Sequence, residues 1–129
     1  MAVLSDALRG DWSVTRAING EADVFVGTAT FTVEQDGLWW RERGRMRVGD
    51  YTGEAHRTYV IVDGEVRFED GRPFHPIDLA AARCEALHLC GPDTYRGVYE
   101  VLSAARFRVV WRVTGPGRDD RIVCDYRRL

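Results

Sequence analysis

GLWWRERGRMRV, residues 37–48, places arginine at every second position over most of its length. Successive side chains of a β-strand point to opposite faces, so these arginines would all lie on one face of a strand. That face must contact water, because neighbouring charged side chains are almost never buried together unpaired. The arginines are Arg41, Arg43, Arg45 and Arg47, and the opposite face then carries Leu38, Trp40, Glu42, Gly44, Met46 and Val48. The segment is therefore predicted to be a strand that turns one acid, Glu42, toward the protein interior.

Turn signals follow one another along the rest of the chain and separate short runs rich in Val, Thr, Phe, Trp and Tyr. Such runs are typical of antiparallel strands joined by tight hairpins. The turn signals are Asn19-Gly20, Asp36-Gly37, Val48-Gly49-Asp50, Asp63-Gly64, Asp70-Gly71 and Gly91-Pro92-Asp93. We expect an all-β fold, an antiparallel up-and-down barrel of about eight to ten strands, because closure removes the exposed edges that invite aggregation.

Alternation assigns inner faces to other strands as well. The predicted inward sets are Trp12, Val14, Arg16 and Ile18; Phe25, Gly27, Ala29, Phe31 and Val33; and Phe107, Val109, Trp111 and Val113. A further strand carries Arg57 and Tyr59 on the face taken as inward, but Val60 on the other face leaves its orientation open. Residues 83–90 divide polar and apolar side chains evenly, so their orientation is open too.

Helix is expected at the N-terminus, as one short turn from Ser5 to Leu8 that Ser5 or Asp6 can cap. Residues 79–84 are ambiguous, because their run of alanines favours helix intrinsically. The predicted fold is thus a barrel with a short N-terminal helical turn.

Length and composition fit a single globular domain over residues 1–129. Hydrophobic residues make up 45% of the chain and the mean hydropathy is −0.30, and no apolar run approaches the ~20 residues that a membrane helix needs. The first residues lack the basic and apolar regions of a signal peptide. Because three cysteines leave at least one unpaired, we expect reduced thiols and a cytoplasmic protein.

The net charge of −2 gives no general attraction to nucleic acid or to an anionic membrane. No aromatic residue lies between one arginine of residues 41–47 and the next on their face, so that face is interpreted as a solvated surface. Neither nucleic acid nor a membrane is expected as a partner, and the sequence leaves the oligomeric state open.

Gly10-x-Trp12 follows the expected helical turn, at the start of the first strand. This arrangement resembles the lipocalin and wider calycin pattern. The resemblance implies that Trp12 plugs the closed end of the barrel. It also implies that an arginine of the last strand, Arg128 or failing it Arg127, crosses over the indole in a cation–π contact.

A second set of motifs spans nearly the whole chain. They are Gly10-x-Trp12-x-x-x-Arg16, Trp40-x-Glu42-x-Gly44, Arg57-x-Tyr59, Phe68-x-x-Gly71-x-x-Phe74-His75, His88-x-Cys90-Gly91-x-Asp93-x-Tyr95, Trp111-x-Val113-x-Gly115-Pro116 and Tyr126-x-Arg128. In these the chain is similar to an uncharacterised family of small, mostly bacterial, calycin-like barrel domains of unknown function. The family usually has a lysine in the last hairpin, where Arg118 stands here, which puts a lysine-specific role in doubt. The resemblance implies a barrel and assigns no activity.

Charged side chains are predicted to meet inside this barrel, because Arg16, Glu42, Arg57 and His88 fall on faces taken as inward. Unpaired buried charges are costly, so such groups neutralise one another or receive a charged ligand. Two arginines against one glutamate leave surplus positive charge, which favours the carboxylate or phosphate of a small, partly apolar molecule. The aromatic residues expected to surround it are Trp40, Tyr59, Tyr95, Tyr99, Trp111 and Tyr126.

Two other interpretations of this interior stay open. The arginines and the glutamate could form a closed network that fixes strand register, in which case the barrel is a filled-core interaction module without a ligand. Alternatively, the barrel could be a small enzyme, an isomerase or hydrolase, with His88 as general base and Asp93 or Tyr95 as its partner.

His88 and Cys90 lie two positions apart on one strand and could share a zinc ion, with His75 or Cys84 as a further ligand. No C-x-x-C pair accompanies them, and the preferred interpretation is a hydrogen-bonded core histidine beside small thiols. Haem ligation by His75 or His88, and nucleophilic catalysis by Cys90, rest on equally unspecific patterns. We therefore expect neither a metal nor a cofactor.

Overall fold

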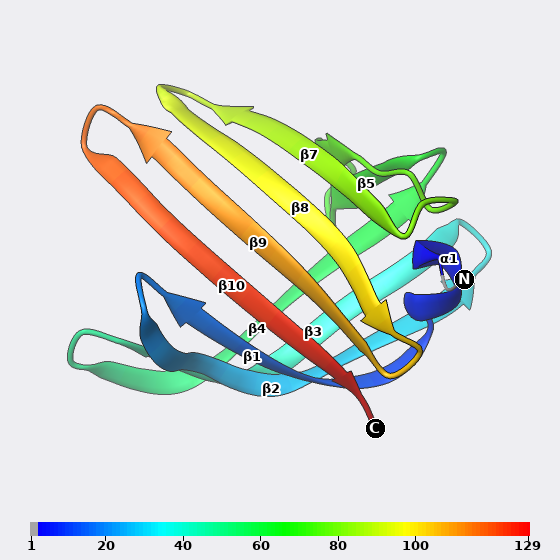
Figure 1. The fold of residues 1–129 in the computed structure, drawn as a ribbon, viewed down its shortest axis with the longest axis horizontal. Helices are drawn as coiled ribbons and strands as arrows, with labels where there is room; N and C mark the ends of the chain where they lie inside the picture. Colours follow the sequence, from blue (N-terminus) through cyan, green and yellow to red (C-terminus); the bar gives the residue numbers. More distant parts are fainter. Residues whose placement is uncertain (1–2) are drawn as a thin grey trace.

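The computed structural model describes residues 3–129, which form one short helix and ten strands (Figure 1). The helix α1 spans Leu4–Ala7. The strands are β1 (Gly10–Ile18), β2 (Glu21–Glu34), β3 (Gly37–Val48), β4 (Tyr51–Val62), β5 (Glu65–Phe68), β6 (Pro73–Pro76), β7 (Arg83–Cys90), β8 (Asp93–Ser103), β9 (Arg106–Gly115) and β10 (Arg118–Arg128). The expected all-β fold with a helical turn at its start is confirmed.

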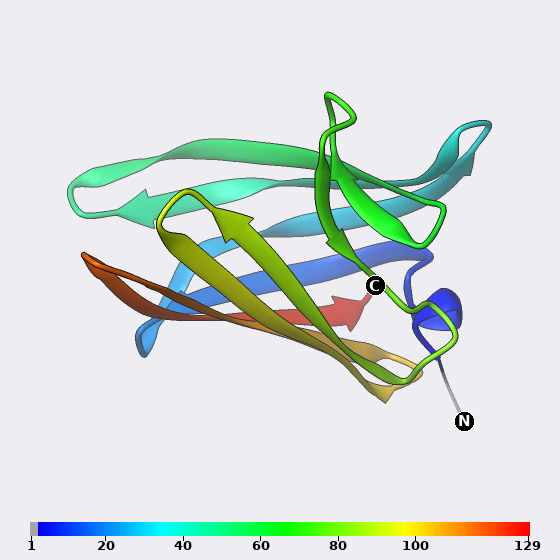
Figure 2. The same cartoon turned by 90° about the horizontal axis from the view of Figure 1, so that it is seen from above.

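All ten strands of the described chain belong to one antiparallel sheet, in the order β6, β5, β4, β3, β2, β1, β10, β9, β8, β7. Each strand pairs with its neighbours in sequence except that β6 and β7 do not pair with each other, and β1 also pairs with β10. The sheet curls into a nearly closed barrel whose two edge strands are β6 and β7. Figures 1 and 2 show the short β5–β6 hairpin at the same end of the barrel as α1.

β6 and β7 face each other without pairing, and we call this gap in the backbone ladder the seam. The sequence of β6, which reads PFHP, explains it. Pro73 and Pro76 have no backbone N–H, so half of this strand cannot donate to a neighbouring strand. The barrel therefore lacks a backbone ladder here. Aromatic side chains bridge the seam instead, with the ring of Phe74 on β6 4.9 Å from the ring of His88 on β7.

The alternation predicted for residues 37–48 is confirmed, since the four arginines of β3 are exposed while Trp40 and Glu42 are buried. Two predicted inward residues are wrong, because Val33 is 70% exposed and Val48 is 56% exposed. Both lie near a strand end, beyond the packed interior. The orientation of β7 is now defined, with Ala86 buried and Leu87 exposed.

Trp12 closes one end of the barrel, where it is fully buried against the edge of Phe107 at 4.8 Å between ring centroids. The cation–π contact implied by the calycin resemblance is present, with the Arg128 guanidinium 4.2 Å from the centre of the Trp12 ring. Leu4 and Leu8 of the helical turn region are also fully buried. This end of the barrel is filled with side chains.

The helix cap differs from the prediction. No side chain caps α1, whose N-cap residue is Val3. The backbone amides of Leu4 and Ser5 instead donate to the carbonyl oxygens of Ala81 and Leu79, at 2.8 and 2.9 Å. The segment before β7 is therefore a loop and turn, not a helix, and its carbonyl groups satisfy the free amides of α1.

Candidate functional site

Three strands bring the predicted charged residues together. Arg57 on β4 lies directly opposite Glu42 on β3 in the antiparallel ladder. Arg16 comes from β1, and β2 between β1 and β3 presents Gly27 and Ala29 at this level. Because these two side chains are small, Arg16 can reach across β2 to the glutamate.

The Glu42 carboxylate, which is 0% exposed, accepts hydrogen bonds from four side chains. Its Oε1 accepts from Arg16 Nη2 at 2.8 Å and from Arg57 Nε at 3.1 Å. Its Oε2 accepts from Trp40 Nε1 at 2.9 Å and from the Tyr126 hydroxyl. A carboxylate offers about four lone-pair sites. Glu42 is therefore saturated by the protein itself.

Electrostatics keep this cluster charged. Burial alone would raise the pKa of Glu42, but the charges of Arg57 and Arg16 and the Tyr126 hydrogen bond outweigh it, so the pKa lies below its ordinary value. Burial alone would lower the pKa of Arg57, but the Glu42 carboxylate keeps that pKa above its ordinary value. With Arg16 also cationic, two positive charges face one negative charge inside the barrel.

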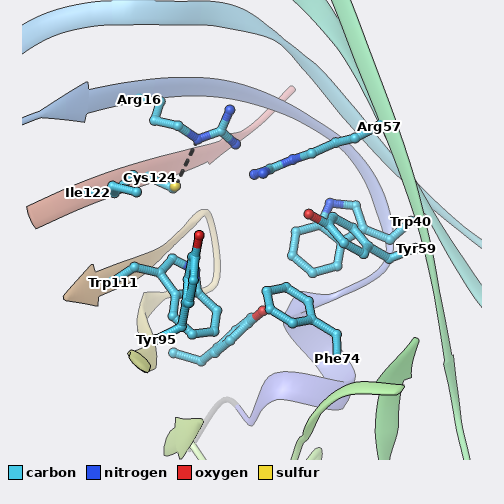
Figure 3. Close-up of a pocket in the computed structure, with 10 residues that line it drawn as sticks. Arg16, Trp40, Arg57, Tyr59, Phe74, Tyr95, Trp111, Ile122 and Cys124 are labelled. Atoms are coloured by element: carbon cyan, nitrogen blue, oxygen red, sulfur yellow. Dashed lines mark hydrogen bonds between the residues drawn. The ribbon is translucent and has the colours of Figure 1, made fainter. Parts of the chain in front are cut away.

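A cavity of about 100 Å³ lies beside the two arginines (Figure 3). Its lining consists of Arg16, Trp40, Arg57, Tyr59, Phe74, Tyr95, Tyr99, Trp111, Ile122 and Cys124. Figure 3 shows the guanidinium groups of Arg16 and Arg57 approaching each other on one side of it. The Arg57 side chain is 40% accessible, against 11% for Arg16. Within residues 3–129, the two terminal nitrogens of Arg57 make no hydrogen bond.

A second cavity, of about 70 Å³, lies beside the same two arginines. Its lining consists of Arg16, Phe25, Glu42, Met46, Ala55, His56 and Arg57. Each cavity depends on a glycine beneath an aromatic ring. A Cβ at Gly97 would lie 2.7 Å from the Trp111 ring, and a Cβ at Gly44 would lie 2.9 Å from the Phe25 ring. A larger residue at Gly97 would collide with the Trp111 ring, and one at Gly44 would collide with the backbone of β2 as well as with the Phe25 ring.

Most of the predicted ligand-binding residues are gathered at this place. Arg16, Trp40, Arg57, Tyr59, Tyr95, Tyr99 and Trp111 line the first cavity. Glu42 and Tyr126 lie behind the arginines as their hydrogen-bonding support. The Tyr95 hydroxyl accepts a hydrogen bond from Arg118 Nη1 at 2.8 Å. The donor-rich guanidinium thus leaves the Tyr95 hydrogen free to donate.

His88 and Asp93 lie apart from the cavity lining. His88 packs at the seam, its ring against Phe74 and 5.8 Å from the ring of Tyr95. Asp93 begins β8, and its Oδ2 lies 3.9 Å from Arg118 Nη1. Cys90 is exposed at the end of β7. In the described part of the chain no three His, Cys, Asp or Glu side chains converge on a possible metal position.

Sequence reasoning missed a buried pair formed by His75 and Tyr99, of which Tyr99 lines the cavity. His75 Nδ1 lies 2.8 Å from the Pro76 carbonyl oxygen, which can only accept, so Nδ1 carries the hydrogen. His75 Nε2, 3.0 Å from the Tyr99 hydroxyl oxygen, then accepts from Tyr99. Burial lowers the pKa of His75, so this histidine is neutral at pH 7. The proline-flanked, four-residue β6 is too short for alternation to have revealed it.

Cys124 was also missed as a lumen residue. Its sulfur accepts from Arg16 Nε at 3.2 Å, and its thiol is free and buried. Cys124 has the same strand parity as Tyr126, which was predicted to lie inside, so alternation could have found it. The contact holds the Arg16 side chain at a second point besides Glu42.

No helix within residues 3–129 is long and apolar enough to cross a membrane. A search of proteins with curated descriptions found no relative. Among solved structures, the S-type phycobiliprotein lyase CPES from Guillardia theta is similar at 7% identity, with a TM-score of 0.64 over 97% of this chain and 90% of the lyase. At this identity the likeness shows the fold alone.

A protein of unknown function from Nostoc punctiforme, assigned to the DUF3598 family, is similar at 13% identity with a TM-score of 0.59. The alignment covers 100% of this chain and 51% of that protein, so the chain spans about half the length of this neighbour. The family resemblance expected from the sequence motifs is confirmed by a match over residues 8–128 to a family profile described as "Family of unknown function (DUF6314)". The chain therefore belongs to the DUF6314 family.

Proposed function

We propose that this protein binds a small anionic, partly apolar molecule inside the barrel, with Arg57 and Arg16 at its anionic group. The observation that carries the proposal is the saturation of Glu42 beside an incompletely bonded Arg57. Four protein donors occupy the carboxylate, while the terminal nitrogens of Arg57 have no partner in the described chain and border a cavity.

The remaining hydrogen-bonding capacity of the cavity favours an anion. Arg16, Arg57 and the Tyr95 hydroxyl all have hydrogens left to donate. Glu42, the acid beside them, has no lone-pair site left for a ligand. Two arginines and one glutamate also leave one positive charge, which a bound carboxylate or phosphate would neutralise at hydrogen-bonding distance.

The apolar part of the ligand would contact the aromatic wall. The rings of Tyr59 and Phe74 are stacked at 5.7 Å between centroids, and those of Phe74 and Trp111 at 5.4 Å. Flat apolar walls with a few convergent polar groups are typical of small-molecule sites. The cavity of about 100 Å³ favours this interpretation over the filled-core module. It is smaller than the ~150 Å³ engineered cavity that accepts benzene, so a ring of that size would be only partly enclosed beside the accessible Arg57.

Titration calorimetry with matched acids and amines tests the proposal. The probes are benzoate and hexanoate against benzylamine and hexylamine, which have the same apolar parts and the opposite charge. We expect both acids to bind and neither amine to bind. Native mass spectrometry of the purified protein gives an independent measure of any small molecule that it retains.

Arg57→Met should weaken benzoate binding at least tenfold, because it removes the free guanidinium and keeps a side chain of similar length. Arg128→Met is the matched control, since Arg128 also lies over an aromatic ring but at the closed end. It should leave the affinity unchanged. The proposal is wrong if the acids do not bind, or if Arg57→Met binds them as tightly as the wild type.

A further inference from the structure

The same two arginines border both cavities. Arg16 and Arg57 line both of them, and among the described residues the two linings share no others. One cavity extends to the aromatic rings of Trp40, Phe74 and Trp111, and the other to Phe25, Met46 and Ala55. A group bound between the guanidiniums therefore has apolar space on two sides.

The net charge of the arginine–glutamate cluster sets a second condition on the ligand. Arg16 and Arg57 carry two positive charges and Glu42 one negative charge, so a single negative charge completes the balance. A phosphate monoester carries between 1.5 and 2 negative charges near pH 7. It would bring more negative charge than these three side chains balance, and Arg16, which is 11% exposed, gives the excess little access to water.

We infer that the ligand is a monoanion whose charged group carries two substituents, as in a phosphodiester, with one substituent in each cavity. The inference rests on the proposed function and specifies it further. A carboxylate meets the charge condition but fills one cavity, and a phosphate monoester meets neither condition. A phosphodiester meets both.

The two substituents need not be alike. Phe74 and Trp111 present nearly parallel rings to the first cavity, with 15° between their planes. The second cavity is bounded by the flexible thioether of Met46 and by the ring of Phe25, over which the Arg16 guanidinium lies at 4.8 Å. The two apolar sides therefore differ, with aromatic rings around the first cavity and one ring with a thioether at the second.

Calorimetry at pH 7.5 with three probes separates charge from shape. Dibutyl phosphate is a monoanion with two arms, pentanoate is a monoanion with one arm, and butyl phosphate is a one-armed anion of higher charge. We expect dibutyl phosphate to bind at least tenfold more tightly than pentanoate. Pentanoate should in turn bind more tightly than butyl phosphate.

Filling the second cavity provides the structural test. Ala55→Leu and Met46→Trp each place a larger side chain in that cavity and so reduce its volume. Neither position lines the first cavity. Each should weaken dibutyl phosphate at least tenfold and change pentanoate less than twofold. Thr52→Leu, on the exposed face of the same strand β4, is the matched control and should change neither. Circular dichroism confirms that each variant is folded.

Each outcome is decisive. Equal affinities for dibutyl phosphate and pentanoate, or unchanged dibutyl phosphate binding in both folded cavity variants, would overturn the two-armed ligand and leave the proposed anion site standing. If none of the three probes binds, and calorimetry also detects no binding of benzoate or hexanoate, the proposed function is wrong together with this inference.

Discussion

Two neighbouring residues of β3, Arg41 and Glu42, form ion pairs on opposite faces of the same sheet. Arg41 Nη1 lies 2.7 Å from Glu34 on the outside, where the two side chains are 45% and 40% exposed. Glu42 Oε1 lies 2.8 Å from Arg16 on the inside, where the arginine is 11% exposed and the glutamate is not exposed at all. The lengths of the two pairs are nearly equal, and their surroundings differ completely.

The difference teaches that burial, not distance, decides what such a pair does. The hydrogen bond from Arg41 lowers the pKa of Glu34, and water can replace that bond if it breaks. For Glu42, burial opposes ionisation and the positive charges of two arginines overcome it. Removing the glutamate inside leaves the nearly buried Arg16 without its counter-charge, whereas removing a partner outside leaves a charge that water solvates.

The largest expected effect is therefore that of Glu42→Gln. The substitution leaves Arg16 and Arg57 facing each other without a counter-charge, and it should lower the free energy of unfolding at pH 7 by about 3–5 kcal/mol. Urea denaturation followed by tryptophan fluorescence measures it. A loss no greater than that of an exposed pair would show that the lumen is well hydrated.

The same variant has a pH signature. Because the folded-state pKa of Glu42 lies below its ordinary value of 4.5, ionised Glu42 stabilises the protein above about pH 4.5, and this stabilisation is lost as the pH falls through the folded-state pKa. The stability difference between the wild type and Glu42→Gln should therefore shrink in acid.

The fold could be predicted from sequence because the alternation on β3 leaves little choice. Four arginines on one face fix the inside of that strand, and the turn signals Asp36-Gly37 and Val48-Gly49-Asp50 mark the hairpins that join it to β2 and β4. Parity placed Glu42 inside but left the orientation of Arg57 open, and only the observed register sets the two residues opposite each other and so on one face.

The rest of the site depends on three-dimensional closure. Phe74 and His75 stand on a four-residue edge strand, where no periodicity can be read. His88 has the inward parity of β7, but β7 is the other edge, so its ring meets Phe74 at the seam and not the arginines. Parity gives the face of a strand, and it does not give the position of that strand around the barrel.

His75 contrasts with Glu42, because both are buried but His75 is neutral at pH 7. Its folded-state pKa is lower than the ordinary 6.5, so the unfolded chain takes up a proton first as the pH falls. The contribution of neutral His75 to the free energy of unfolding should be fully present above about pH 6.5. Below that pH the free energy of unfolding should decrease, by at most about 1.4 kcal/mol for each pH unit. Denaturation midpoints between pH 7 and 5.5 measure this decrease.

The matched variant for this decrease is His75→Phe/Tyr99→Phe. It removes both members of the side-chain hydrogen bond, so that only the Pro76 carbonyl oxygen loses a donor, and it should abolish the decrease. A decrease that persists in the double variant would assign the titration to another group.

Arg128 gives a smaller effect. It donates to the backbone carbonyl oxygens of Arg9 at 2.9 Å and Ala104 at 3.1 Å, and it covers Trp12. Because this contact is at an exposed barrel end, Arg128→Met should lower the free energy of unfolding by about 0.5–1 kcal/mol. Benzoate binding, measured in parallel, should not change, which would contrast Arg128 with Arg57.

The smallest effect should come from the outer member of the opening pair. Glu34→Gln leaves Arg41 in water, near Thr32 and stacked on the Trp39 ring at 4.8 Å, so its guanidinium keeps other contacts and its hydration. We expect no stability change beyond the error of urea denaturation, at low salt or at high salt. A large, salt-sensitive loss would mean that the outer arginines of β3 act as a coupled network and that exposure alone does not distinguish the two faces.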